Sequence, residues 1–205
     1  MIKKTSEQIA ERREEIVNAC EKLYQTMSFK EITLKEIGEK VPFSRPTIYN
    51  SFQTKEEIFL ALFQREYERW NAALVSILED NEKLEKREIA EKIAASLSER
   101  VQLLKLLSMN NYDMEANSRA EILTDFKKAY GRSMQLFCMI LAKFCSEKSP
   151  SDIQNITYMF FPFMFGIYPY TAVTEKQRAA MRNAGVDYTY KSVYEITYNC
   201  LIKLL

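Results

Sequence analysis

The sequence predicts an all-α protein of two domains, and two features of its 205 residues lead to this prediction. Glycine and proline, which the turns of a β-sheet use often, number only 4 and 5. Apolar residues recur three and four positions apart through most of the chain, which is the period of an amphipathic helix. We therefore expect three short helices, then a long helix, and then a larger helical body.

Capping residues mark the three short helices. The first begins with the capping-box spacing Thr5-x-x-Gln8, and the second begins with Thr33-x-x-Glu36. The third begins at Ser44, a favourable N-cap residue. Pro46 lies in the first turn of this helix, where a missing N–H costs little. We expect the third helix to end near Ser51.

The long helix opens with a third capping box, Thr54-x-x-Glu57, and continues to about residue 78. No flexible linker follows the short helices, because the long helix itself connects the two parts. We therefore expect a first domain at residues 1–53 and a second at 54–205. In the second domain the apolar pattern predicts further helices at 84–109, 118–145, 153–172, 175–183 and 187–205.

Composition excludes most enzyme chemistries. The chain has no histidine, so a Ser-His-Asp triad, a Cys-His pair and a histidine-ligated metal site cannot form. The glycines are too far apart for a glycine-rich phosphate loop. The 4 cysteines form no C-x-x-C pair, and we interpret them as reduced core thiols of a cytoplasmic protein. We expect no metal and no cofactor; a helical enzyme that uses Glu, Lys, Cys or Tyr is the alternative from another class.

One apolar stretch is long enough to raise the question of a membrane span. No charged residue occurs between Asp152 and Glu175, and a span needs about 20 apolar residues. The stretch contains Pro162 and Pro169, however, and no basic cluster flanks it to set an orientation. We therefore expect a helix buried in a core or a subunit interface, and no membrane partner.

The second and third short helices have the spacing of a helix-turn-helix. Ile48 and Phe52 are four residues apart and are expected to face the core, which leaves outward Arg45, Thr47, Tyr49 and Asn50. Arginine and asparagine can bond guanine and adenine in pairs, and hydroxyl groups reach phosphates. Residues 40–55 carry three cations and no acid, whereas residues 1–60 balance ten cations with ten acids. An ordinary three-helix bundle with a polar third helix is the alternative.

Four motifs carry a resemblance to a known family. They are Arg13-x-x-Ile16, Phe29-x-x-Ile32-Thr33-x-x-x-Ile37, Ser44-x-x-Thr47-Ile48-Tyr49-x-x-Phe52 and Lys55-Glu56-Glu57-Ile58. With them the stretch from Arg12 to Trp70 resembles the N-terminal domain of the TetR family of bacterial transcriptional repressors. The later helices fit the size and the all-α body of that family.

The resemblance implies contacts with double-stranded operator DNA. Thr33, at a helix N-terminus, and Lys55, at the start of the long helix, would each hold a phosphate. The residues implied to line the major groove are Ser44, Arg45, Pro46, Thr47, Tyr49 and Asn50. Two positions depart from the family pattern: Pro46 stands where the family often has a small residue, and Pro42 replaces the usual glycine of the turn and cannot adopt a positive φ. The turn must therefore be built differently.

The resemblance also implies a homodimer formed through the last two long helices. Tyr190, Tyr194 and Tyr198 step by four residues along one face of the last predicted helix, while a second face is also apolar. Such a helix needs a partner in addition to the core. The residues assigned to the dimer interface are Phe161, Phe165, Tyr190, Tyr194, Ile196 and Tyr198.

A small-molecule effector is the third implied partner. Large or soft side chains of the kind that line apolar cavities are Trp70, Met109, Tyr112, Phe126, Tyr130, Met134, Phe137, Met159 and Phe163. Plain core packing is the alternative for each of them. The sequence thus predicts a cytoplasmic homodimer that binds palindromic operator DNA, represses transcription and is released by an effector. A TetR-like activator and a DNA binder without a ligand remain alternatives.

Overall fold

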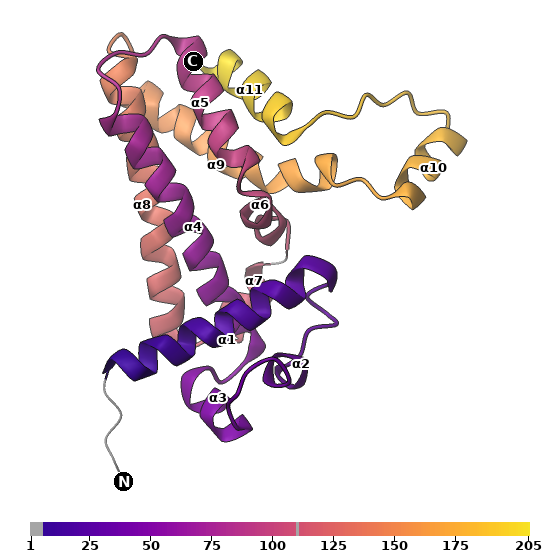
Figure 1. Ribbon diagram of the computed structural model, residues 1–205. Coiled ribbons are helices and arrows are strands. Elements are labelled where there is room, and N and C mark those ends of the chain that lie inside the picture. The colour runs from indigo at the N-terminus through magenta and orange to yellow at the C-terminus, as the bar shows by residue number, and fades with distance from the viewer. Residues whose placement is uncertain (1–5, 110) are drawn as a thin grey trace. The chain divides into compact units, whose positions relative to one another are not determined.

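The computed structural model describes residues 6–109 and 111–205, and all regular structure in these residues is helical. Figure 1 shows the helices, whose bounds are α1 Ser6–Thr26, α2 Leu34–Gly38, α3 Arg45–Ser51, α4 Lys55–Glu79, α5 Lys86–Ser98, α6 Val101–Leu107, α7 Asn111–Ala116, α8 Ala120–Phe144, α9 Pro150–Thr171, α10 Glu175–Asn183 and α11 Val193–Leu204. The predicted all-α fold is confirmed. Thr5 of the first predicted capping box lies outside the described residues.

The chain divides into two compact units, and the division falls inside α4 and α8. Unit 1 comprises Met1–Arg65 and Asn110–Lys128, and unit 2 comprises Glu66–Met109 and Ala129–Leu205. Unit 1 therefore extends beyond residue 53, where the sequence suggested a domain boundary. The physical reason is that Phe63 of α4 packs on Phe126 of α8, with ring centroids 4.8 Å apart.

In unit 1, α2 and α3 lie on the same side of α1 (Figure 1). Ile37 of α2 and Ile48 of α3 are buried with Ile16 of α1, and Phe52 is buried at the end of α3. The predicted inward direction of Ile48 and Phe52 is thus confirmed. Phe59 of α4 completes this core. Its ring packs edge-to-face against the rings of Tyr24 and Phe29.

In unit 2, α11 packs against α5 and α9, and α6 packs against α9. The core contains a cluster of aromatic rings from α4, α8 and α9, in which Phe137 stacks on Phe160 at 4.9 Å. Trp70 is fully buried, and its indole N–H donates a hydrogen bond of 3.1 Å to Ser96 Oγ of α5. The aromatic residues of the second half of the chain therefore supply the core of unit 2.

The helix predicted at 84–109 is wrong, because the structure has two helices there, α5 and α6. At this break the Ser98 hydroxyl donates a hydrogen bond of 2.8 Å to the Ala94 carbonyl within α5. Arg100, the N-cap residue of α6, leaves the helical conformation with a ψ of 42°. Leu97 and Leu104 are both fully buried. The break lets the leucines on either side of it reach the core.

The last helix begins later than predicted. The sequence suggested a start at 187, but α11 starts at Val193 because Ser192 is its N-cap and forms a capping box with Glu195. Tyr190 is therefore outside the helix, where the Arg178 guanidinium lies 4.1 Å from its ring centroid. The helix α7 was not predicted. The helix predicted at 175–183 is confirmed as α10, and Gly185, with a φ of 66°, follows just after it.

Helix α9 contains the apolar stretch that raised the question of a membrane span. Among the residues that the structure describes, no helix combines the length and apolar character needed to cross a bilayer. Seven residues of α9 are buried in unit 2, including Ile156, Phe160 and Met164. Core packing therefore accounts for much of its apolar character.

Candidate nucleic-acid interface

The helix α2 is held at its start by a complete capping box. The Thr33 side chain accepts a hydrogen bond from the Lys35 N–H at 3.2 Å, and the Glu36 carboxylate accepts one from the Thr33 N–H at 3.2 Å. The Thr33 hydroxyl also donates to Glu36, and this bond lowers the pKa of the Glu36 carboxyl. The hydroxyl expected to hold a phosphate is thus already bonded to an ionised carboxylate of its own helix.

The turn from α2 to α3 is built without a left-handed residue. Glu39 ends α2 in the right-handed helical region, and its N–H donates to the Lys35 carbonyl at 3.0 Å. No residue from 39 to 44 has a positive φ. The expectation that Pro42 requires a different turn is therefore confirmed.

The helix α3 turns one polar face outward. Arg45, Tyr49 and Asn50 are exposed, with 52% of the Tyr49 surface accessible, while Ile48 between them is buried. Ser44 and Pro46 are exposed at the start of the helix and Thr47 is half-buried. A hydrogen bond of 3.0 Å joins the Ser44 and Thr47 hydroxyl groups. The face that the sequence predicted for base contacts is therefore accessible.

A hollow of about 560 Å³ lies beside this face, where α2, α3 and α4 begin. Its lining brings together four of the predicted DNA-contacting residues: Thr33, Arg45, Tyr49 and Lys55. Lys35 and Glu56 also line it, so that three cations face one carboxylate. A concave, cationic surface next to an exposed recognition face suits the phosphate backbone of DNA.

Lys55 has a structural role that the sequence did not reveal. Its ammonium group donates to the carbonyls of Phe29 and Ile32, at 2.8 and 3.1 Å, and lies 4.1 Å from the Phe29 ring centroid. An ammonium group has three N–H donors, so two of them tie α4 to the connector before α2. One donor remains for a phosphate.

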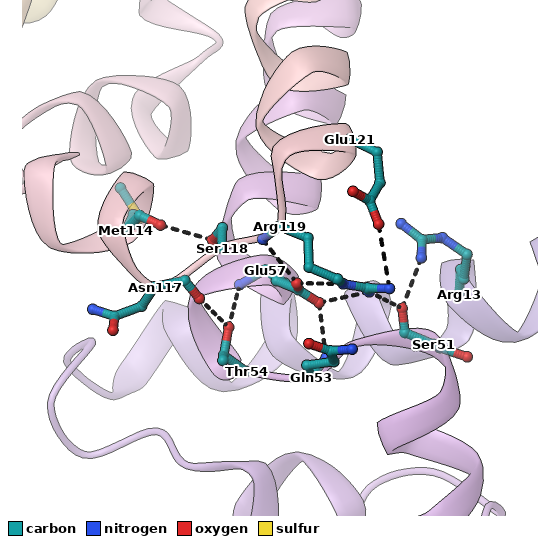
Figure 2. Close-up of polar contacts among 10 residues, drawn as sticks. All are labelled: Arg13, Ser51, Gln53, Thr54, Glu57, Met114, Asn117, Ser118, Arg119 and Glu121. Atoms are coloured by element: carbon teal, nitrogen blue, oxygen red, sulfur yellow. Dashed lines mark hydrogen bonds and ion pairs between the residues drawn. The ribbon is translucent and has the colours of Figure 1, made fainter.

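Polar residues behind α3 join the end of this helix to the starts of α4 and α8, as Figure 2 shows. We call Arg13, Ser51, Gln53, Thr54, Glu57, Asn117 and Arg119 the junction cluster. Its centre is Glu57, which is only 1% exposed. The carboxylate accepts four hydrogen bonds, three from Arg119 (N, Nε and Nη2) and one from the N–H of Gln53, at 2.6 to 3.1 Å.

The predicted capping box at α4 forms only in half. The Glu57 N–H donates to Thr54 Oγ1 at 3.2 Å, but the Glu57 carboxylate bonds to the N–H of Gln53 instead of that of Thr54. Burial by itself raises the pKa of Glu57, yet the hydrogen bonds and the charge of Arg119 outweigh it and hold the pKa below its ordinary value. Glu57 is therefore ionised at neutral pH.

Comparison with known families agrees with this geometry over most of the chain. Residues 16–62 match the family model described as bacterial regulatory proteins, tetR family. Residues 64–191 match the model described as tetracyclin repressor-like, C-terminal domain. The chain belongs to the TetR family. Proteins of this family are ligand-responsive, DNA-binding regulators of transcription.

Solved structures of other TetR-like regulators have the same fold. The fatty acid degradation regulator FadR from Bacillus halodurans matches with a TM-score of 0.59 and 14% identity, covering 98% of this chain and 96% of that one. FadR from Bacillus subtilis, solved with stearoyl-CoA, matches with 0.59 and 15%, covering 93% and 96%. MbdR from Azoarcus sp. CIB matches with 0.55 and 16%, covering 94% and 97%. A sequence comparison with curated proteins gave no match.

Only some of the residues that the family resemblance suggested for an effector site lie close together. In unit 2, the ring centroids of Trp70 and Tyr130 lie within 6 Å of that of Phe161. The ring centroid of Phe163 lies 6.2 Å from that of Phe160, which stacks on Phe137. Met109 and Met134 are half-buried in that unit, while Met159 is 51% exposed. Tyr112 and Phe126 belong to unit 1, where Tyr112 is 83% exposed.

The residues suggested for the dimer interface also divide. Phe165 and Tyr194 are exposed, by 39% and 38%, and Ile196 and Tyr198 are half-buried on α11. Phe161 is only 2% exposed, because it faces inward and packs on Trp70 and Tyr130. Phe161 therefore belongs to the core of unit 2 and not to a dimer surface.

Arg119, Asn117 and Arg13 were not predicted as functional residues. Their partners are 38 to 68 positions away in the sequence, so no local pattern reveals them. Another cavity was also not predicted, although its lining residues all lie between positions 169 and 190. It measures about 520 Å³ in unit 2 and is lined by apolar residues near the end of α9 and around α10, among them Tyr170, Val173, Met181 and Tyr188.

Replacing Lys55 should affect stability, whereas replacing Arg45 should not. Lys55→Met removes two charge-assisted hydrogen bonds to carbonyls, so we expect the free energy of unfolding to fall by about 1–3 kcal/mol. Arg45→Met changes an exposed side chain and should alter it by less than about 0.5 kcal/mol. Urea denaturation measures both values. Equal losses in the two variants would contradict the anchoring role of Lys55.

Glu57 should make the stability depend on acid pH. Its pKa is lower in the folded protein than in the unfolded chain, so its contribution is complete above about pH 4.5 and is lost as the pH falls through the folded pKa. The variant Glu57→Gln lacks this titration. We expect the difference in unfolding free energy between wild type and variant to shrink from about pH 5 to about pH 3. A constant difference in denaturation measured across that range would argue against this prediction.

Proposed function

We propose that this TetR-family protein is a repressor that binds palindromic operator DNA as a homodimer and is released by a small molecule. The observation that carries the proposal is the exposed polar face of α3, supported from below by the buried Ile48 and Phe52. A repressor role is typical of the family. Activation of transcription is the second candidate, and the position of the operator relative to a promoter would distinguish the two.

The chemistry of α3 suits direct contact with bases. Arg45 can donate two hydrogen bonds to a guanine, and Asn50 can bond an adenine through its amide. The Tyr49 hydroxyl can reach a phosphate or a base edge, and the remaining N–H of Lys55 can hold a phosphate beside it. Because the net charge of the chain is only +1, we expect weak non-specific binding and a large share of base contacts in the specificity.

The proposed dimer surface is the exposed side of α9 together with α11, which pack against each other in unit 2. Tyr158 and Phe165 are seven residues apart, so they lie on one side of α9, and both are exposed. Tyr194 and Tyr198 stack on α11 with ring planes 4° apart. An exposed apolar surface of this kind is typical of protein–protein interfaces. Two recognition helices should then meet half-sites about 34–36 Å apart.

The proposed effector site is in unit 2. Support comes from the aromatic cluster around Phe160 and Phe161 and from the apolar cavity beside Tyr170 and Tyr188. Because a regulator of the same fold was solved with stearoyl-CoA, this compound is a reasonable first one to add to the operator complex. Release requires that the effector bind the DNA-free conformation more tightly than the DNA-bound one.

Selection of bound sequences from a random duplex pool tests DNA recognition. We expect a palindromic consensus, and Tyr49→Ala and Asn50→Ala should each weaken binding to it by about 1–3 kcal/mol without lowering the melting temperature. Lys92→Ala, which removes an exposed side chain of unit 2 outside the proposed sites, is the control and should bind like wild type. Fluorescence anisotropy gives the affinities. Failure to enrich any sequence would refute the proposed function.

Charged residues in the proposed dimer surface should give monomers. Tyr194→Glu combined with Ile196→Glu places two carboxylates in an apolar contact that has no partner for them, which costs several kcal/mol. Sedimentation equilibrium should then report a single chain. Lys92→Glu, an exposed change on α5 outside the proposed dimer surface, should remain dimeric. A dimer in the double variant would reject this surface.

A further inference from the structure

Arg119 forms hydrogen bonds through both its backbone and its side chain. It directly precedes α8, and its carbonyl accepts the first hydrogen bond of that helix, from Leu123 N–H at 3.1 Å. Its guanidinium donates two hydrogen bonds to the Glu57 carboxylate, from Nε at 2.6 Å and from Nη2 at 2.8 Å (Figure 2). A paired, planar contact of this kind fixes direction as well as distance, which a single ion pair does not.

The same guanidinium reaches the end of the recognition helix. Arg119 Nη2 donates to the Ser51 carbonyl at 3.3 Å, and Arg13 Nη1 of α1 donates to the same oxygen at 2.8 Å. Ser51 is the last residue of α3, so two cations lie at the negative end of that helix. The Arg13 guanidinium also lies 4.3 Å from the Phe52 ring centroid. The C-terminus of α3 is thus held from α1 and from α8.

The short connection between α3 and α4 is held by two further bonds. Glu57 accepts the N–H of Gln53 at 2.7 Å, and the Thr54 hydroxyl donates to the Asn117 carbonyl at 2.9 Å. Gln53 and Thr54 are two of the three residues between these helices. Their conformation sets the angle between α3 and α4, so the contacts with residues 117–119 determine how α3 is presented.

We propose that Arg119 is a positioning residue for DNA recognition, which holds α3 in its binding orientation through Glu57 and Ser51. The proposal rests on the proposed function, since it concerns the face of α3 that would meet the bases. Arg119 touches no base itself. Since α8 continues from unit 1 into unit 2, Arg119 also joins the orientation of α3 to the first turn of a helix that enters the effector-binding part of the chain.

An outer contact of the same guanidinium supplies a matched control. Arg119 Nη1 lies 3.6 Å from Glu121 Oε1, and the Glu121 side chain is 67% exposed, whereas that of Glu57 is 1% exposed. Exposed ion pairs contribute little, because solvent screens them. Glu121→Gln therefore removes one partner of Arg119 without disturbing the junction cluster.

The test compares Arg119→Lys and Glu121→Gln with wild type. Lysine keeps the charge but loses the planar fork, so Glu57 stays paired while the direction of the contact is lost. Affinities are measured for the selected operator and for an unrelated duplex, at a temperature where all proteins are folded. We expect Arg119→Lys to lower the ratio of the two affinities about tenfold and Glu121→Gln to leave it unchanged. A loss of stability alone would not move this ratio.

Hydrogen–deuterium exchange supplies a readout that does not require DNA. In Arg119→Lys the amides of residues 48–53 should exchange about tenfold faster, while those of the centre of α1 stay protected. If the lysine variant does not fold, Glu57→Gln is measured in its place with the same expectation. Unchanged exchange of α3, or an unchanged affinity ratio, would overturn the proposal. A wild-type protein that selects no DNA would refute the proposed function instead, and the exchange measurement would still decide the role of Arg119.

Discussion

A buried carboxylate is the contact on which the arrangement of unit 1 depends. Glu57 is almost inaccessible to water, and a buried charge is tolerated only where hydrogen bonds and an opposite charge replace the lost hydration. Its two oxygens accept four N–H groups, which satisfies the acceptor capacity of a carboxylate. Because those donors come from the α3–α4 connection and from the residue before α8, the requirement to satisfy one side chain fixes the mutual positions of three helices.

The exposed face of α3 is the consequence of that packing. Ile48 and Phe52 are held against the core, and Arg13 and Arg119 hold the carbonyl at the end of the helix. Arg45, Tyr49 and Asn50 are left on the outside without a role in the core. A seven-residue helix has too few internal hydrogen bonds to be stable by itself. The exposed face of α3 therefore derives its rigidity from residues elsewhere in unit 1.

Two of the predicted DNA contacts also serve the fold. Thr33 closes the capping box of α2, and Lys55 ties the start of α4 to the carbonyls of Phe29 and Ile32. Both line the same hollow as Arg45 and Tyr49. A mutation at Lys55 thus changes the scaffold together with any phosphate contact, which makes Tyr49 and Asn50 the cleaner positions for testing base recognition.

Local pattern determined the fold class, most helix bounds and which face of α3 is exposed. Capping residues and a period of 3.6 residues act within one or two turns, so Thr33, Ser44 and Ile48 could be assigned without knowledge of distant contacts. The break between α5 and α6 was not predicted, because packing decides that Leu97 and Leu104 both reach the core. The late start of α11 was missed although its capping box, Ser192-x-x-Glu195, is a local signal. Only the tertiary structure decided that Arg119 meets Glu57 and that Phe161 lies inside. Such contacts join residues far apart in the chain, and sequence periodicity carries information about a helix face but none about what packs against it.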